Sequence, residues 1–251
     1  MGNVIDKAFG ILEEIISSSP EPCLPTPLAE KLGLNRATCS RILKQLTDMG
    51  YLIRLSRLRG YAPGPKILTL HTIAKFEQEF LKAAVPAIDS CAERLNCSVL
   101  AARLYGGRRY VLHHRNCSSE LDIQITQPCY DDIFCTATGL LLAAHLPEEE
   151  QLSCFREQRK RGAEVMAELR SESIMLQKLQ DIYRRKYFEC AKEIQWIYAV
   201  PVYRKGKFYA ALGASIPIGQ HSAALSRKIL TAMTQTAEEI SNSLSKRYII
   251  G

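Results

Sequence analysis

Residues 35–48, with the sequence NRATCSRILKQLTD, constrain the fold of this chain more than any other stretch. The stretch opens on Asn35, whose side-chain oxygen can accept hydrogen bonds from the free amides of a new helix. Apolar residues at helical spacing then predict one inward face, made of Ala37, Ile42, Leu43 and Leu46. The opposite face is polar and basic, with Arg36, Thr38, Ser40, Arg41 and Lys44. Such a helix suits a DNA major groove, although an ordinary solvated surface helix shows the same pattern.

The residues before this stretch favour the first of these two interpretations. Helical spacing of apolar residues predicts a helix over residues 3–18, and the prolines within residues 20–25 predict a loop after it. Thr26 and Pro27 are typical of an N-cap and a first helical position, so we expect a short second helix that Gly33 ends. Two helices joined by a short turn with glycine make a helix-turn-helix, and Gly50 is the expected left-handed residue after it.

Positive charge is concentrated around the helix-turn-helix. Two β-prone runs, residues 51–54 and 59–62, predict a hairpin or wing that carries Arg54, Arg57 and Arg59. Such a wing would lie along phosphates or reach a minor groove. Between residues 35 and 66 there are seven Lys and Arg against the single acid Asp48. The resulting net charge of this segment, +6, nearly equals the net charge of +7 of the whole chain. This confined charge indicates nucleic-acid binding.

Composition and motifs exclude several other classes of protein. The 251 residues allow one large or two modest domains, at ~100–200 residues each. No run of about 18 apolar residues is present, so no membrane span is expected. The N-terminus lacks the layout of a signal peptide, and we expect a cytoplasmic protein. No GxSxG, P-loop or HExxH motif occurs, so neither an enzyme nor a cofactor is expected.

The nine cysteines form no CxxC, which favours reduced thiols over a disulfide framework. His113, His114 and Cys117 suggest a metal site, but adjacent residues of a strand point to opposite faces and the tight spacing of zinc sites is absent. We therefore expect no metal. A redox switch through Cys39 would need a lowered thiol pKa, which Arg36 or the helix N-terminus would supply.

The remaining pattern predicts a second domain. The PGP sequence of residues 63–65 marks a boundary, so we expect a first domain at 1–64, a linker helix at 65–80 and a second domain at 81–251. The apolar stripe of residues 67–80 fits either a dimerisation helix or a helix packed on its own core. Expected helices are 85–95, with Pro86 near its start, 137–146, 147–160, 171–186 and 223–246. Expected strands are 98–105 and 108–115 about Gly106-Gly107, 121–127, 196–203 and 207–216. The fold class is α+β.

In this arrangement the chain resembles the IclR family of bacterial transcriptional regulators over nearly its whole length. The matching stretches are LAEKLGLNRATCSRILKQLTDMGYL (28–52), RGYAPGPKILTL (59–70), QITQPCYDDIFCTATGLLLAAHLPEEE (124–150) and YAVPVYRKGKFYAALGASIP (198–217). The resemblance implies a winged helix-turn-helix joined by a linker helix to a C-terminal α/β GAF-like effector-binding domain. It also implies a homodimer or tetramer that binds a palindromic operator in double-stranded DNA, acts as a repressor, and responds to a small carboxylate or apolar metabolite.

Residue-by-residue matching gives candidate effector-binding positions, which are Ala137, Thr138, Gly139, Cys190, Glu193, Ile197, Gly213 and Ser215. The chain departs from the family pattern at or beside several of them, including Gly213, where the family has a serine, and Cys190 and Glu193, which match a shortened acidic loop imperfectly. A Gly-Lys dipeptide of the family is Gly139-Leu140 here, and a cysteine of the family is Ile197. These departures leave two outcomes open, a more apolar effector or no effector.

The candidate DNA-binding residues are Thr26, Asn35, Arg36, Thr38, Ser40, Arg41, Lys44, Arg54, Arg57 and Arg59. We expect residues 36–41 to reach base edges, and Lys44 and the wing arginines to contact phosphates. Two alternatives remain. One is a regulator that senses metal or redox state through its cysteines, and the other is a regulator whose C-terminal domain only mediates oligomerisation.

Overall fold

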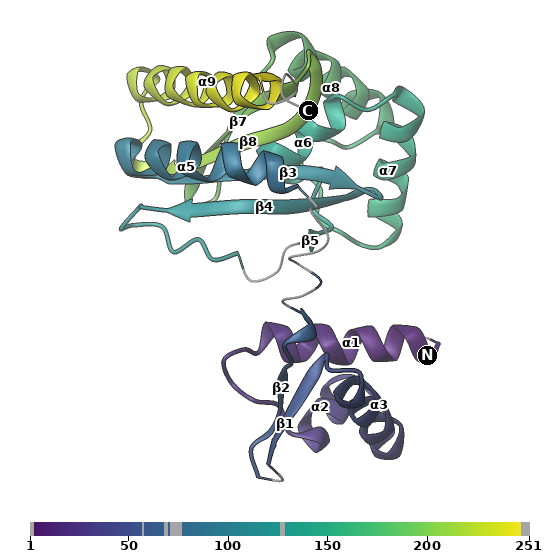
Figure 1. The fold of residues 1–251 in the computed structure, drawn as a ribbon. Coiled ribbons are helices and arrows are strands. Elements are labelled where there is room, and N and C mark those ends of the chain that lie inside the picture. The colour runs from purple at the N-terminus through teal and green to yellow at the C-terminus, as the bar shows by residue number, and fades with distance from the viewer. Residues whose placement is uncertain (1–2, 57, 68–69, 71–76, 126–128, 247–251) are drawn as a thin grey trace. The chain divides into compact units, whose positions relative to one another are not determined.

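The structure is a computed structural model that describes residues 3–56, 58–67, 70, 77–125 and 129–246 (Figure 1). The chain divides into two compact units, Met1–Phe76 and Glu77–Gly251. The predicted fold class is confirmed, since a winged helix-turn-helix unit precedes an α/β unit with an antiparallel sheet. Half of the predicted linker helix, residues 68–69 and 71–76, lies outside the described residues, and residues 78–80 begin helix α5 (Gln78–Leu95).

The first unit contains α1 (Val4–Ser17), α2 (Pro25–Lys31), α3 (Arg36–Asp48) and the antiparallel strands β1 (Leu52–Ser56) and β2 (Gly60–Pro63). Its core brings together Ile11, Leu28, Leu43 and other inward residues of all three helices. The loop after α1 crosses β2, where the backbones of Cys23 and Tyr61 exchange two hydrogen bonds of 2.9 Å. Glycine at position 60 permits this close approach of the two backbones, because a Cβ there would lie 2.3 Å from the Cys23 carbonyl oxygen.

Two details of the predicted helix-turn-helix are wrong. Helix α2 begins at Pro25 with Leu24 as its N-cap, so Thr26 is not the cap, because a proline without an N–H fits the first helical position. The inward face of α3 contains Cys39 in place of Ala37. Residues 39, 42, 43 and 46 share one side of the helix, whereas Ala37 lies one turn from Arg41 on the exposed side. Gly50 takes the predicted left-handed conformation, with φ +82°.

The second unit is built on a six-stranded antiparallel sheet with the strand order β5-β4-β3-β8-β7-β6. The strands are β3 (Ser98–Tyr105), β4 (Arg108–Asn116), β5 (Cys129–Tyr130), β6 (Phe188–Lys192), β7 (Gln195–Arg204) and β8 (Lys207–Pro217). The helices besides α5 are α6 (Ala137–Ala144), α7 (Glu148–Lys160), α8 (Glu172–Arg185), the short η1 (Ile218–Gln220) and α9 (Ala223–Lys246). Both predicted hairpins, β3–β4 and β7–β8, are present.

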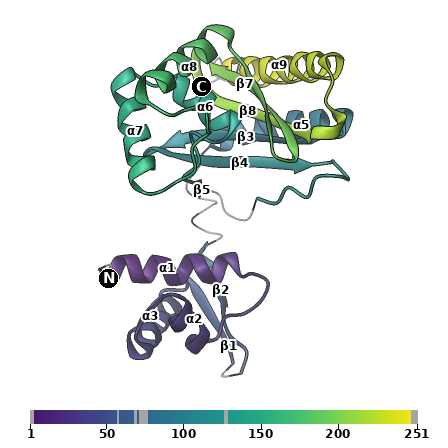
Figure 2. The same ribbon diagram turned by 180° about the vertical axis from the view of Figure 1, so that it is seen from behind.

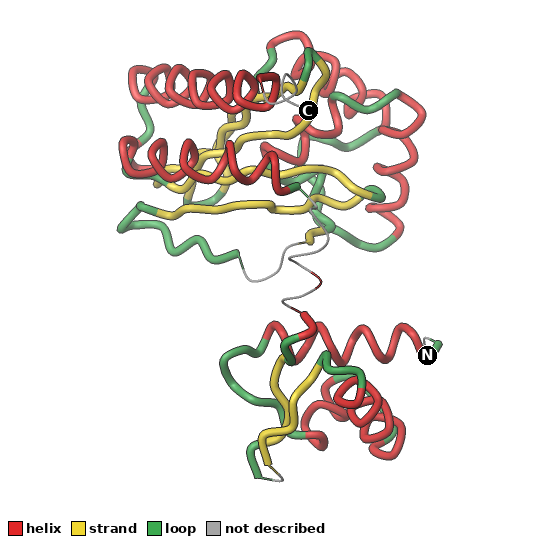
Figure 3. Tube along the Cα trace, viewed as in Figure 1, coloured by secondary structure: helices red, strands yellow, loops and turns green. Residues whose placement is uncertain are grey.

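Helices cover both faces of this sheet. Helices α5 and α9 lie side by side over one face (Figure 1), and α6, α7 and α8 cover the other, as the view from behind shows (Figure 2). Alternate residues of a strand point to opposite faces, so Tyr198 and Val200 pack under α5 and α9, and Ile197 and Ala199 pack under α6 and α8. The sheet runs through the middle of the unit as a layer between helices (Figure 3).

The structure corrects three predictions for the second unit. Residues 121–125 form no strand, and residues 126–127 lie outside the described part. The apolar residues alternate because Ile123 and Ile125 line a cavity on one side of this segment. The segment does not pair with β4, which pairs with β5 instead. Strands β5 and β6 were not predicted. Pro86 lies inside α5, which begins at Gln78 instead of residue 85.

Candidate functional site

The exposed face of α3 is the first candidate site. Asn35 caps the helix, with the Ala37 backbone N–H donating to Oδ1 at 2.8 Å. Side chains of Arg36, Ser40 and Lys44 follow at intervals of four residues and are exposed, so they share one face. Arg41 is exposed beside them. Thr38 is half-buried, and Thr26 is exposed in the first turn of α2.

The cations of this face differ in their partners. An Arg36 guanidinium nitrogen lies 3.1 Å from the Glu30 carboxylate of α2, and both side chains are largely exposed. A surface ion pair of this kind contributes little and is easily exchanged. Arg41 and Lys44 form no ion pair with any residue that the structure describes. The face is therefore free to meet a polyanion.

The β1–β2 hairpin adds further cations to the first unit. Arg54 is exposed on β1, with its guanidinium carbon 5.8 Å from the centroid of the Tyr61 ring. Arg59 is exposed at the tip, where its backbone N–H donates to Ser56 Oγ at 3.0 Å. Arg57 lies outside the described residues. The structure thus joins the described wing arginines and α3 in one unit.

The second candidate site is a cavity of about 160 Å³ in the second unit, under the N-terminus of α6. Its floor is the sheet, where Ser98 of β3 is paired with Ser215 of β8, and Leu100 with Gly213. Ile123 and Ile125 supply apolar wall from the segment after β4. Segments far apart in the sequence therefore converge on one space.

Five of the eight predicted effector positions line this cavity, namely Ala137, Thr138, Ile197, Gly213 and Ser215. The other three do not line it. Gly139 packs on the backbone of Ile133, where a Cβ would lie 2.3 Å from the carbonyl oxygen. Cys190 packs against the core under α6 and α8, and Glu193 is an exposed turn residue with φ +47°.

Gly213 and Thr138 limit the size of the cavity. A Cβ on Gly213 would lie 2.5 Å from Thr138 Cγ2, so only glycine leaves this space open. The hydroxyl-bearing side chains of Thr138 and Ser215 are 4% and 7% exposed. Neither hydroxyl has a hydrogen-bond partner within the part of the chain that the structure describes. Both residues line the cavity, so their hydroxyls are placed to bind a molecule in it.

Two cations at the cavity were not predicted, Arg109 and Lys192. The buried Arg109 guanidinium forms a bidentate ion pair with the Asp132 carboxylate. Nε donates to Oδ1 at 2.7 Å, and Nη2 donates to Oδ2. Lys192 donates to the Cys135 carbonyl at 3.1 Å and lies 3.4 Å from the Glu164 carboxylate. Each cation therefore has an acidic partner, and the wall is close to electrically neutral.

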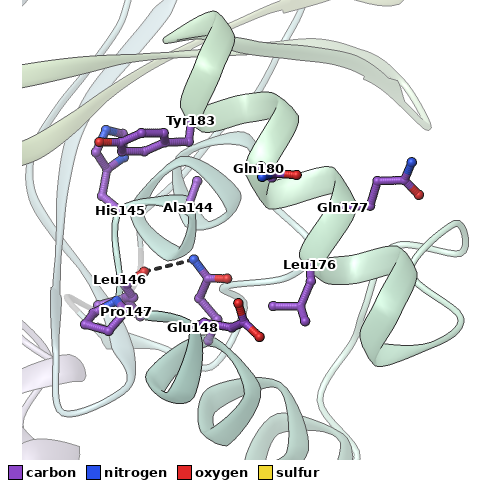
Figure 4. Close-up of a pocket in the computed structure, with 10 residues that line it drawn as sticks. Ala144, His145, Leu146, Pro147, Glu148, Leu176, Gln177, Gln180 and Tyr183 are labelled. Carbon is purple, nitrogen blue, oxygen red and sulfur yellow. Dashed lines mark hydrogen bonds between the residues drawn. The ribbon is translucent and has the colours of Figure 1, made fainter.

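A larger hollow of about 620 Å³ lies elsewhere in the second unit, between the α6–α7 junction and α8 (Figure 4). His145 stacks on Phe208 at a centroid distance of 3.7 Å and its Nδ1 lies 2.9 Å from the Leu141 carbonyl oxygen. Burial lowers the pKa of this imidazole. Gln177, Gln180 and Tyr183 line the hollow from α8 but are exposed. It is an open surface groove, and none of the predicted site residues lies in it.

The histidines and cysteines show no metal chemistry within the described residues. His113 Nε2 lies 2.7 Å from Asp89, and His114 Nε2 lies 2.8 Å from Ser98 Oγ, so the two rings turn to different partners. Among the residues described, no group of three potential ligands is placed to hold an ion. Burial raises the pKa of the Cys39 thiol, which is the reverse of what a reactive thiol on α3 requires. No helix in the described ranges is both long and apolar enough to cross a membrane.

Comparison with known proteins identifies the first unit of this chain. Residues 4–56 match the family model of the IclR helix-turn-helix domain. The HTH-type transcriptional regulator TtgV of Pseudomonas putida is 30% identical over 157 residues, which are 62% of this chain. Residues 4–56 are therefore an IclR-type helix-turn-helix domain. The match spans 59% of the length of that relative.

Solved IclR structures share the fold of this chain over nearly its whole length. An IclR transcriptional regulator from Alicyclobacillus acidocaldarius has a TM-score of 0.74 at 18% identity, covering 98% of this chain and 100% of that one. An IclR homologue from Microbacterium hydrocarbonoxydans, complexed with 4-hydroxybenzoate, has a TM-score of 0.76 at 17% identity, covering 96% and 99%. At such identities the likeness establishes the fold alone.

Proposed function

We propose that this chain is a member of the IclR family, that it is a sequence-specific, DNA-binding transcriptional regulator and not an enzyme, and that a small organic effector in the cavity of its second unit changes its affinity for DNA. The exposed basic face of α3, in a unit that matches the IclR helix-turn-helix domain, is the observation that carries this proposal. The arginine-bearing hairpin beside it supports the same function.

In this proposal α3 enters the major groove. Arg36, Ser40 and Arg41 reach base edges, with Thr38 lying at the edge of the same face. The residues assigned to the phosphate backbone are Thr26, Asn35, Lys44, Arg54, Arg57 and Arg59. Arg41 is the main candidate for base reading, because it is exposed and lacks an ion-pair partner among the described residues.

A homodimer, or a tetramer built from dimers, fits the surface of α1. Its inner face buries Ile11 and Ile15, but Ile5 and Phe9 are 65% and 59% exposed on the same helix. An exposed apolar face of this kind marks an interaction surface, and two copies related by a twofold axis would cover it. Such a dimer would place two α3 helices on the half-sites of a palindromic operator.

The cavity supports a small, mostly apolar effector with one polar group. Its volume of about 160 Å³ lies below the ~300–1,000 Å³ that is typical for drug-sized ligands. The free hydroxyls of Thr138 and Ser215 suit a hydroxyl or a carboxyl group, and the isoleucines suit an aromatic or aliphatic body. The 4-hydroxybenzoate that the Microbacterium homologue binds has both features. Because Arg109 already has a carboxylate partner, a carboxylate effector would have to compete with Asp132.

We retain repression in the cytoplasm as the expected mode of action, with release of DNA when the effector binds. If the cavity instead serves only the packing of the second unit, no small molecule will stabilise the protein, since a ligand of the folded state must raise its stability.

Arg41→Ala tests the DNA-binding assignment. We expect it to cost about 1–3 kcal/mol of binding free energy on a selected operator and to relax sequence preference. Binding would be measured by fluorescence anisotropy at several salt concentrations. The matched control is Lys228→Ala, which removes an exposed cation from α9 of the second unit and should leave the affinity unchanged. Equal affinity of wild type and Arg41→Ala would contradict the assignment.

A further inference from the structure

Three of the nine cysteines meet at one corner of the second unit. Cys97 directly precedes β3, Cys117 directly follows β4, and Cys91 lies in the last turns of α5. All three belong to, or pack against, the core between the sheet and the helices α5 and α9. They are distinct from the cavity under α6, which lies on the other face of the sheet.

Cys97 and Cys117 are cross-strand neighbours. The β3–β4 ladder ends with Ser98 opposite Asn116, and one further step places Cys97 opposite Cys117. The hydrogen bond from the Cys117 backbone N–H to the Cys97 carbonyl oxygen, 3.2 Å long, continues the ladder through this pair. Directly opposite residues of an antiparallel pair project to the same face, so both thiols enter the same core.

The backbone spacing of this pair suits a disulfide. A hydrogen-bonded antiparallel pair has its Cα atoms about 5.5 Å apart. The Cα atoms of two cysteines joined by a disulfide usually lie about 4.4–6.8 Å apart. The Cβ atoms of a disulfide lie about 3.5–4.5 Å apart, and those of directly opposite residues about 4.5–5.5 Å, so the bond also draws the ends of β3 and β4 together. Only one hydrogen bond joins the pair, because the Cys97 backbone N–H donates to the Ala92 carbonyl oxygen at 3.2 Å, so this end of the ladder is held less firmly than its middle.

The two thiols differ in exposure and in neighbours. Cys97 is fully buried, and burial, together with Cys91 and Cys117 close by, raises the pKa of its thiol to about 12. Cys117 is half-buried, and a hydrogen bond with its sulfur raises the pKa of the exposed Arg115 guanidinium. Cys117 is thus the sulfur that meets an oxidant, and Cys97 is placed to resolve it.

We propose that Cys97 and Cys117 form a reversible disulfide when a hydroperoxide oxidises Cys117. In the first step a sulfur–oxygen bond forms as the oxygen–oxygen bond breaks, giving a sulfenic acid on Cys117 and, from hydrogen peroxide, one water. In the second step the Cys97 sulfur displaces the hydroxyl, which leaves as water with the thiol proton. Two thiols and one peroxide give one disulfide and two waters, and a dithiol reductant reverses the change.

Mass spectrometry of the full chain tests this inference. The reduced protein is treated with one equivalent of hydrogen peroxide, unfolded, and alkylated at all remaining thiols. We expect seven of the nine cysteines to be alkylated, with the loss of two hydrogens and a single cross-linked peptide joining Cys97 and Cys117. Dithiothreitol should restore all nine. Nine alkylated thiols after peroxide, or a cross-link that involves another pair, would overturn the inference.

Three variants separate the pair from its neighbour. Cys117→Ser and Cys97→Ser should each abolish the cross-link, and Cys117 should then accumulate over-oxidised sulfur in Cys97→Ser because nothing resolves it. The matched control, Cys91→Ser, removes the third thiol of the corner and should leave the cross-link intact. Loss of the cross-link in Cys91→Ser would show that Cys91 is the resolving residue, which contradicts the assignment. The mapping on wild-type protein stands even where a variant fails to fold.

Discussion

The guanidinium of Arg109 forms a two-pronged ion pair with the carboxylate of Asp132 at the wall of the cavity, with Nε 2.7 Å from Oδ1. The side chain of Arg109 is 6% exposed and that of Asp132 is 21% exposed, so the pair is largely shielded from water. It joins β4 to the loop that leads into α6. The pair therefore neutralises the charge of Arg109 at the cavity and fixes the position of β4 relative to the loop before α6.

Replacing Asp132 by Asn should destabilise the second unit, because it removes the counter-charge of a buried guanidinium and keeps the shape. We expect the free energy of unfolding to fall by about 2–4 kcal/mol, which is slightly less than for a fully buried pair. Urea unfolding followed by the fluorescence of Trp196, the single tryptophan, reports on this unit. The control is Asp131→Asn, whose partners Arg108 and Arg161 are 43% and 52% exposed, so the loss of their counter-charge should cost less. Equal losses in the two variants would argue against the role of burial.

Gly213→Ala should close the cavity, since its Cβ would lie 2.5 Å from Thr138 Cγ2. We expect a loss of stability of about 1–3 kcal/mol from overpacking, and no stabilisation by added ligand. Thermal unfolding would be measured with 4-hydroxybenzoate, benzoate and phenol, at least one of which should raise the melting temperature of the wild type.

The double variant Gly213→Ala with Thr138→Ser removes the clashing methyl and should recover most of the lost stability. Gly219→Ala serves as the control, because a Cβ there meets nothing within 4 Å. If Gly213→Ala binds the same probes as tightly as the wild type, the cavity is not the effector site.

Gln158→Met should stabilise the protein. The side chain of Gln158 is 2% exposed, and both polar atoms of its amide lack a hydrogen-bond partner in the described part of the chain. A buried group without partners costs free energy, so an unbranched apolar replacement should add about 1–2 kcal/mol to the free energy of unfolding. The control is Gln151→Met, which breaks the 2.9 Å hydrogen bond from Nε2 to the Leu146 carbonyl and should destabilise. A lower melting temperature for Gln158→Met would show that the amide is satisfied in solution.

The sequence predicts elements well where periodicity and breakers agree. Helix α3 and its Asn35 cap, the Gly106-Gly107 hairpin and the long helix α9 follow from local rules, because capping and turn chemistry act within a few residues. Residues 121–125 show where such rules fail. Alternating burial in Ile123 and Ile125 looks the same whether a segment pairs with a strand or lines a cavity.

The cavity was predictable only in part. Thr138, Gly213 and Ser215 follow from the family resemblance, but Arg109 and Lys192 lie on β4 and β6 and reach the site only through the tertiary fold. Their acidic partners, Asp132 and Glu164, are also distant in sequence. Pairs at such separations leave no local pattern, so charge neutrality of the site appears only in three dimensions.

Selection of random double-stranded DNA by the purified full-length protein tests the central claim most directly. If α3 reads base edges in a twofold dimer, repeated selection should enrich an inverted repeat whose half-sites lie about one helical turn, ~10–10.5 base pairs, or a multiple of it, apart. The same selection with Arg41→Ala should enrich a weaker or different half-site. Wild-type protein that enriches no sequence over the starting pool would contradict the account.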